Sequence, residues 1–276
     1  MAWECFDVKR EGGIANVILN RPAAMNAMNL AFWRELPQVV RHLESEGGTR
    51  VAVLSSTGKH FTAGMDLSVF SGSEVAGTAT AIDREKFRLK LVELQQTFLA
   101  LANARFPVIA AIHGGCIGGG VDMVSACCLR YATKDAFFSI QEIHLAMMAD
   151  VGTLNRMPKA MPEAVVRELA YTGDRLPAER AERLGWVNGT FDSQAEMLEA
   201  VMAVARKIAD KNPVAIAATK EMISYTRDHS VAESYAYLNA RQPGLFDIDA
   251  VRAAAVASRK GETPKYEDLP PQRDGG

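Results

Sequence analysis

The chain has 276 residues, of which 48% are apolar and 23% charged, a length and balance that suit one large domain with a substantial core. Its 31 basic and 33 acidic residues give a net charge of −2, which argues against nucleic acid or another polyanion as a partner. No apolar run approaches the ~20 residues of a membrane span, and the N-terminal segment has no apolar signal core. We therefore expect a cytoplasmic protein with no membrane segment.

The first half of the chain alternates between strand-like and helix-like patterns. In chain order the expected elements are a hairpin at 3–20, a helix at 29–46 with Asn29 as its cap, a strand at 50–57, an amphipathic helix at 80–104, a strand at 106–114, and short strands near 128–132 and 136–140. This alternation of strands and helices predicts an α/β core.

From about residue 153 the pattern is helical almost throughout. Helices are expected at 162–171, 177–184, 193–210, 214–228, 231–241 and 247–259, with Pro213 in a first helical turn. The Pro-, Asp- and Gly-containing stretch from Gly261 predicts a loose tail. The predicted organisation is a core at 1–200, a helical C-terminal region at 201–260 and the tail at 261–276.

The cysteines are Cys5, Cys116, Cys127 and Cys128. None has C-x-x-C spacing, and the adjacent pair cannot easily bridge to itself. We expect reduced, mostly buried thiols, as in an intracellular protein.

A glycine-rich loop, "HGGCIGGGVD", covers residues 113–122. It lacks the Lys-Ser/Thr pair of a P-loop and the glycine spacing of a dinucleotide fingerprint. Asp122 at its exit would also repel a phosphate. The loop therefore does not predict a phosphate site.

A second small-residue turn, "TAGMD" at 62–66, also follows a predicted strand. If a helix begins near Gly119, its first N–H groups have no partner within the helix and carry partial positive charge. Together with an N–H of the 63–65 turn they would stabilise a carbonyl oxygen that becomes negative. The alternative is that both segments are ordinary tight turns in a packed sheet.

Three carboxylates accompany the loop, namely Asp122, Glu142 and Asp150. The segment between Glu142 and Asp150 is apolar apart from His144. Burying an acid is costly unless it is hydrogen-bonded or takes part in chemistry, so the three are candidate catalytic groups. The alternative is that they are solvated loop residues.

Five motifs together identify a resemblance to the crotonase (enoyl-CoA hydratase/isomerase) superfamily over residues 5–265. They are "LNRPAAMNAMN" (19–29), "KHFTAGMDL" (59–67), "AAIHGGCIGGGVDM" (110–123), "GTLNRMPKAM" (152–161) and "NPVAIAATKEMI" (212–223). The resemblance implies a crotonase-like spiral of ββα units and a helical trimerisation region that makes a homotrimer or homohexamer. It also implies an acyl-CoA substrate and neither a separate cofactor nor a metal.

The same resemblance assigns site residues by position. The backbone N–H groups of Met65 and Gly119 would form the oxyanion hole. Residues expected at the substrate are Met25, Ala27, Ala63, Gly64, Asp66, Ile117 and Gly118, with Asp66 structuring its loop. Val121, Met147 and Met148, together with Ile117, are suitable walls for an acyl chain; the alternative for each is ordinary core packing.

The carboxylate pattern resembles the Δ3,5-Δ2,4-dienoyl-CoA isomerase branch of the family. Hydratases carry glutamate at the position of Asp122 and glycine near Asp150, whereas Glu142 matches their second glutamate. This resemblance implies conversion of 3,5-dienoyl-CoA to 2,4-dienoyl-CoA. We expect Glu142 to act at C2 and Asp150 at C6, although the two roles could be exchanged, with Asp122 orienting Glu142 or raising its pKa.

Two other functions are compatible with the family motifs. One is a 2-enoyl-CoA hydratase or Δ3,Δ2-enoyl-CoA isomerase, against which the shorter Asp122 side chain argues. The other is a weakly catalytic scaffold that binds RNA, as in a branch with a lysine-rich surface helix. Residues 29–46 contain no lysine and only Arg34 and Arg41 as basic residues besides His42, which argues against that branch.

Overall fold

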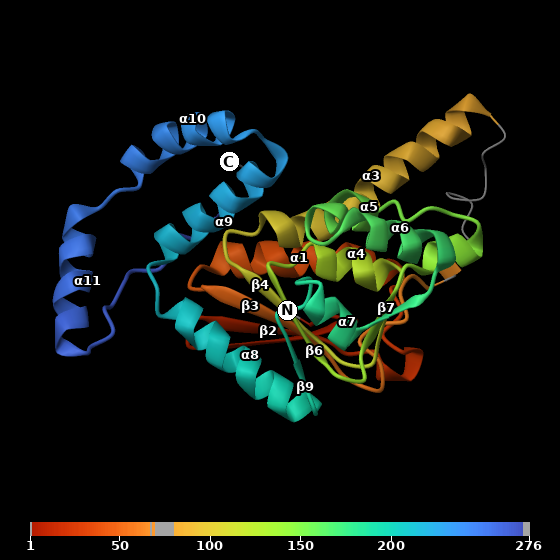
Figure 1. The fold of residues 1–276 in the computed structure, drawn as a ribbon, viewed down its shortest axis with the longest axis horizontal. Helices are drawn as coiled ribbons and strands as arrows, with labels where there is room; N and C mark the ends of the chain where they lie inside the picture. Colours follow the sequence, from red (N-terminus) through yellow and green to blue (C-terminus); the bar gives the residue numbers. More distant parts are fainter. Residues whose placement is uncertain (1, 67, 70–79, 273–276) are drawn as a thin grey trace.

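A six-stranded sheet forms the centre of the protein, in the order β1-β2-β3-β4-β6-β9. The structure, a computed structural model, describes residues 2–66, 68–69 and 80–272 (Figure 1). The strands are β1 (Phe6–Glu11), β2 (Ile14–Leu19), β3 (Val51–Ser56), β4 (Val108–Ile112), β6 (Leu129–Thr133) and β9 (Gly189–Phe191). Only β1 and β2 pair antiparallel, as the predicted hairpin, and every other pair is parallel.

A smaller sheet stands beside the first and consists of β5 (Gly115–Ile117), β7 (Phe137–Ser139) and β8 (Arg175–Pro177). Of the four strands of three residues in the described ranges, the sequence predicted β7 and not β5, β8 or β9, because so short a strand gives little sign of a period of two. The α/β class predicted from the sequence is confirmed.

Both faces of the large sheet are covered by helices. Val51 and Val53 of β3 pack toward α8 (Gln194–Ala209), whereas Ala52 and Leu54 join the cluster under α1 (Leu30–Glu46). Figure 1 shows α8 on one side of the sheet and α1 with α4 (Gly119–Ser125) on the other. Strands buried on both faces are continuously apolar, which explains the composition of the predicted strands.

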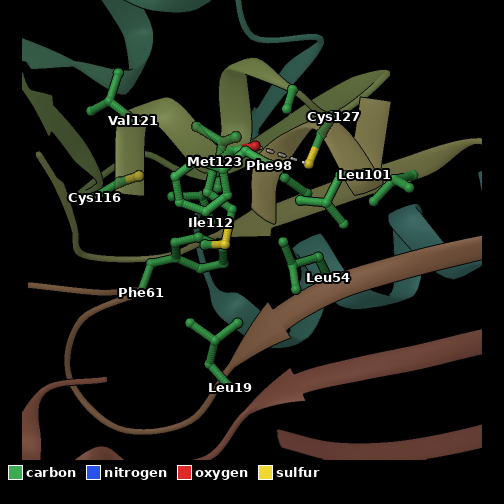
Figure 2. Close-up of a cluster of buried hydrophobic side chains, with 14 of the residues drawn as sticks. Leu19, Leu54, Phe61, Phe98, Leu101, Ile112, Cys116, Val121, Met123 and Cys127 are labelled. Atoms are coloured by element: carbon green, nitrogen blue, oxygen red, sulfur yellow. Dashed lines mark hydrogen bonds between the residues drawn. The ribbon is translucent and has the colours of Figure 1, made fainter. Parts of the chain in front are cut away.

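The larger core cluster fixes α4 against the sheet. Figure 2 shows Met123 of α4 beside Phe98 of α3 (Ala81–Asn103) and Ile112 of β4, with Phe61 and Leu54 nearby. All five side chains are buried. Truncating one such side chain to alanine typically costs about 2–5 kcal/mol, so this packing holds the glycine-rich loop rigidly at the end of β4.

Side-chain caps define where several helices begin. The Asn29 side chain accepts a hydrogen bond from the Phe32 N–H at 3.0 Å, as the sequence predicts for α1. Thr80 and Asp83 form a capping box at the start of α3. Asn212 caps α9 (Pro213–Asp228) with Pro213 in its first turn.

The remaining helices are short or C-terminal. The short ones are α5 (Thr153–Arg156), α6 (Glu163–Thr172), α7 (Ala178–Arg183) and the 3-10 turns Pro22–Ala24, Gln141–Leu145, Met157–Lys159 and Gln242–Gly244. After α9 come α10 (Val231–Arg241) and α11 (Ile248–Lys260), which project from the body (Figure 1). Large apolar side chains are exposed on α9 (Ile223), on α10 (Val231 and Tyr235), on the segment before α11 (Phe246) and on α11 (Ile248, Val251 and Val256).

The tail from Gly261, predicted to be loose, is irregular but attached in its described part, residues 261–272. Arg50 donates hydrogen bonds to the Asp268 carboxylate and the Tyr266 carbonyl, each at 2.6 Å. The Gln272 N–H donates to the Glu44 carbonyl at 3.0 Å. These contacts return the chain to the edge of the core. No helix in the described ranges has the length and apolar character to cross a bilayer.

Candidate active site

A cavity of about 280 Å³ opens where the two small-residue turns meet. Its walls come from the 63–65 turn, the glycine-rich loop, the segment 141–151 and α3. Ten of the residues that the sequence predicted at the site line it, namely Ala63, Gly64, Met65, Ile117, Gly118, Gly119, Glu142, Met147, Met148 and Asp150. Segments up to about 90 positions apart in the sequence therefore meet at the place that the sequence predicted.

Two backbone N–H groups at this cavity have no acceptor among the residues that the structure describes. Gly119 is the first residue of α4, so its N–H precedes the helical hydrogen bonds. The Met28 N–H donates to the Gly64 carbonyl at 2.8 Å, and the Met28 carbonyl accepts from the Asp66 N–H at 3.1 Å. The N–H of Met65, which lies between Gly64 and Asp66, is left unused. Within the described ranges neither N–H donates a hydrogen bond.

Gly64 brings these two groups together. It adopts φ +85°, and a Cβ there would lie 2.5 Å from the Ile117 carbonyl oxygen and 3.5 Å from the Gly119 nitrogen. Only glycine adopts this φ readily and also permits so close an approach of two backbones. The arrangement can hold one oxygen atom between two donors.

Glu142 lies beside this pair of donors. The Oε1 atom of Glu142 would be 3.1 Å from a Cβ on Gly118. The Oε2 atom of Glu142 is buried and has no hydrogen-bond partner in the described chain. Burial, and next the nearby Asp122 carboxylate, raise the pKa of Glu142 to about 7. A carboxyl group with this pKa exchanges a proton readily at neutral pH.

Asp122 is fully buried beneath the cavity and does not line it. Its Oδ1 accepts a hydrogen bond from the Thr153 N–H at 2.6 Å, and its Oδ2 has no partner among the described residues. Burial raises the pKa of Asp122 to about 6 despite that hydrogen bond. An unpartnered carboxylate oxygen at this depth is costly, which points to a role in the site.

Asp150 lines the same cavity, at its α3 side. Burial raises the pKa of this carboxyl, and the Asp150 carbonyl accepts a hydrogen bond from the Gln95 side chain of α3 at 2.8 Å. The charge of Asp150 raises the pKa of both Asp122 and Glu142. The three carboxyl groups therefore form one electrostatically coupled set.

Some predicted residues lie elsewhere. Met25, Ala27 and Asp66 do not line the cavity. The Met25 carbonyl accepts from the Ala63 N–H at 2.9 Å, and Asp66 accepts from the Ser68 N–H at 3.0 Å, so both organise the turn. Val121, for which both an acyl-chain wall and core packing were open, belongs to the hydrophobic core and does not line the cavity.

One wall of the cavity was missed by the sequence analysis. Phe87, Lys90, Leu91 and Leu94 of α3 all line it. Phe87, Leu91 and Leu94 are spaced i, i+4 and i+7, which places them on one helical face. That spacing was visible in the sequence, but it did not show which other segment the face would contact.

No metal site accompanies these groups in the residues that the structure describes, since no cluster of three or more His, Cys, Asp or Glu side chains is arranged to hold an ion. His113, the first residue of the glycine-rich segment, has a structural role. It is buried, and its Nε2 lies 2.8 Å from the Gly58 carbonyl oxygen.

The family model for enoyl-CoA hydratase/isomerase matches residues 9–250 of the chain. The chain belongs to the enoyl-CoA hydratase/isomerase family. The resemblance found in the sequence motifs is thereby confirmed, and the protein is an enzyme of acyl-CoA metabolism.

Several proteins of this family are similar over most of the chain. The mitochondrial Delta(3,5)-Delta(2,4)-dienoyl-CoA isomerase of Homo sapiens is 42% identical over 253 residues, which are 90% of this chain and 77% of that protein. The peroxisomal one of Arabidopsis thaliana is 36% identical and covers 94% of each chain. The enoyl-CoA hydratase structure from Bacillus anthracis has a TM-score of 0.86 at 27% identity and covers 95% of this chain and 99% of its own.

These comparisons confirm the crotonase-like fold of this family member and correct one expectation. The prediction of a cytoplasmic protein is wrong, because the isomerases that it matches are mitochondrial and peroxisomal. Composition and net charge, on which the prediction depended, describe solubility and carry no compartment address.

Proposed function

We propose that this family member converts 3,5-dienoyl-CoA to 2,4-dienoyl-CoA by moving a proton from C2 to C6. The observation that carries the proposal is the set of three coupled carboxyl groups, two of which line the cavity that holds the unused Met65 and Gly119 N–H groups. The similarity to dienoyl-CoA isomerases over 90% or more of the chain supports it. The acyl-CoA carries its own CoA, and no separate cofactor enters the mechanism.

The thioester oxygen would lie between the N–H groups of Met65 and Gly119. These donors stabilise the negative charge that develops on the oxygen when the C2 proton leaves, and they make that proton acidic enough to remove. Because C2 is bonded to the thioester carbon, its base must lie beside the donors. Glu142 has that position, because its Oε1 would be 3.1 Å from a Cβ on Gly118 and it lines the same cavity as the two donors, so we assign it the C2 proton.

The C6 proton has to arrive at the far end of the conjugated system. Removal at C2 gives an extended dienolate, and protonation at C6 leaves double bonds at C2–C3 and C4–C5, so atoms and charge balance. Asp150 lines the same cavity, and burial raises its pKa, which suits a proton donor. Asp122 does not touch the cavity and acts through Glu142, whose pKa its charge raises.

The oxyanion hole makes a direct prediction for Gly64→Ala. A Cβ at φ +85° and 2.5 Å from the Ile117 oxygen must separate the two turns, so kcat should fall by about 10²-fold. Steady-state kinetics with a 3,5-dienoyl-CoA measure this. Gly185→Ala, with a similar φ of +77° and open space around its Cβ, is the matched control. An unchanged kcat for Gly64→Ala in a folded protein would remove these donors from the mechanism.

A comparison of two substrates tests the reaction itself. Purified protein should produce the ultraviolet absorbance of a 2,4-dienoyl-CoA from 3,5-octadienoyl-CoA much faster than it hydrates crotonyl-CoA. The shorter Asp122 side chain and the carboxylate at Asp150 favour isomerisation of the dienoyl-CoA over hydration of crotonyl-CoA. Rapid hydration of crotonyl-CoA without dienoyl isomerisation would identify the alternative, a 2-enoyl-CoA hydratase.

We also propose that the protein is a homotrimer or homohexamer assembled through α10 and α11. These two helices project from the body, and apolar side chains are exposed on them and on the segment between them, among them Tyr235, Phe246 and Val251. Exposed apolar patches of this kind mark interaction surfaces. Light scattering should give three or six times the chain mass, and Val251→Glu should lower it. A monomer at micromolar concentration would contradict the assembly.

A further inference from the structure

A second cavity, of about 590 Å³, lies between α9 and the body, away from the proposed active site. Its walls come from the end of α4, the start of β6, the turn at 156–160 and α9. Polar contacts connect α9 to the body. Lys220 of α9 donates a hydrogen bond to the Ala104 carbonyl, and Asp228 of α9 forms an ion pair with Lys159. We call this space the α9 cleft.

The α9 cleft is lined by cations and by no carboxylate. Five cationic side chains face it, namely Arg130, Arg156, Lys159, Lys220 and Arg227, and no Asp or Glu is among its lining residues. Asp228 pairs with Lys159 and Arg227 next to the cleft. The other three cations have no ion pair with any described residue. Cations in partly buried sites normally have a counter-charge, so this set is unusual.

Two of those three cations are satisfied by the backbone. Lys220 donates to the carbonyls of Leu101, Ala104 and Phe106 at 2.6–3.1 Å, and thereby caps the end of α3. Arg130 donates to the carbonyls of Val124, Cys127 and Trp186. A cation at a helix C-terminus is stabilised by the helix dipole, so both have structural roles.

Arg156 has no such partners. Its guanidinium is half-buried and makes no hydrogen bond or ion pair within the ranges that the structure describes. Burial, and next the nearby Arg227, lower the pKa of Arg156; the carboxylates of Asp122 and Asp228 act in the opposite direction, although neither bonds to the guanidinium. A guanidinium offers five N–H donors in a planar fork that matches a carboxylate or phosphate. Arg156 therefore has donors available for a further anion.

The rest of the α9 cleft suits an aliphatic chain. Apolar walls are supplied by Leu129, Trp186, Ile208, Ile216 and Ile223. A volume of about 590 Å³ is within the range of sites that hold small organic ligands. A free inorganic anion would leave most of these walls without contacts.

We propose that the α9 cleft binds an amphipathic anion, with a carboxylate or phosphate head group on Arg156 and an aliphatic chain along the apolar walls. This site is separate from the acyl-CoA cavity, since the two share no lining residue. The proposal does not depend on the isomerase reaction, because it concerns other residues and is tested by binding alone.

Calorimetry on the full-length protein tests the proposal with three ten-carbon probes. These are decanoate, decyl phosphate and decyltrimethylammonium, each below its micelle concentration. Binding of decanoate or decyl phosphate, but not of the cation, is expected, and the tighter of the two anions identifies the head group. Saturating octanoyl-CoA should leave this binding unchanged.

Two variants locate the site. Arg156→Met should weaken anion binding about tenfold or more, because it removes a charge-assisted hydrogen bond. Ser224→Trp should do the same by filling the α9 cleft, and exposed Arg183→Met on α7 is the control. Three results would overturn the proposal. They are the absence of anion binding, binding of the anion to both cleft variants as tightly as to the wild-type protein, and displacement of the anion by octanoyl-CoA.

Discussion

Glu142→Gln is expected to lower kcat for dienoyl isomerisation by about 10³-fold or more with little change in KM. The substitution keeps the shape of the side chain and removes the group that we assign to the C2 proton, and a positioned acid or base typically contributes 10²–10⁴-fold. The pKa of Glu142, raised to about 7 by burial and by Asp122, is suited to that role at neutral pH. Steady-state kinetics in the ultraviolet provide the measurement.

Hydrogen exchange at C2 separates the roles of the two cavity carboxylates. In ²H₂O, Asp150→Asn should still exchange the C2 hydrogen of 3,5-octadienoyl-CoA while it forms little 2,4-dienoyl product. Glu142→Gln should lose both reactions. Exposed Glu199→Gln on α8 is the matched control for a change of one carboxyl to amide. If Glu142→Gln kept its exchange and Asp150→Asn lost it, the two assignments would be reversed.

Glu142→Gln is also expected to stabilise the protein at pH 8, by about 1–3 kcal/mol in the free energy of unfolding. The pKa of Glu142 is about 7 in the folded protein and close to its usual value of 4.5 when unfolded. The unfolded chain thus releases this proton first as the pH rises. Each pKa unit corresponds to about 1.4 kcal/mol, so the native state loses stability from about pH 4.5 to pH 7.

Denaturant unfolding at pH 4 and at pH 8 measures this effect. The variant should gain little at pH 4, where both states of the wild-type protein carry the proton, and its full increment above pH 7. Glu199→Gln should show no such pH dependence. An increment for Glu142→Gln that is equal at the two pH values would mean that its carboxylate carries no burial penalty. Together with lost activity, a gain in stability would show that the site is strained for function.

The sequence predicts the elements whose signals are local. Asn29 predicts the start of α1 because a side-chain cap depends on residues three positions away. The glycine-rich loop predicts the start of α4 at Gly119 because glycine is needed where the chain leaves a strand and approaches another backbone. The strands β3 and β4 are predicted from their apolar runs, because strands buried on both faces of a sheet are apolar along their length.

Features that depend on distant contacts were missed. The α3 wall of the cavity, with Phe87 and Lys90, is fixed by packing against segments about 60 positions away. The attachment of the tail through Arg50 and Asp268 joins residues 218 positions apart. Neither pairing has a local pattern, because surface charges and helical apolar faces are compatible with many partners.

In the mechanism that we propose, two carboxyl groups remove a proton at C2 and deliver one at C6 of a 3,5-dienoyl-CoA. Incubation of 3,5-octadienoyl-CoA with the wild-type protein in ²H₂O, followed by NMR of the product, is the decisive measurement. We expect 2,4-octadienoyl-CoA with deuterium at C6, delivered by an exchangeable carboxyl group. A 3-hydroxyacyl-CoA product, or unchanged substrate without deuterium at C6, would contradict it.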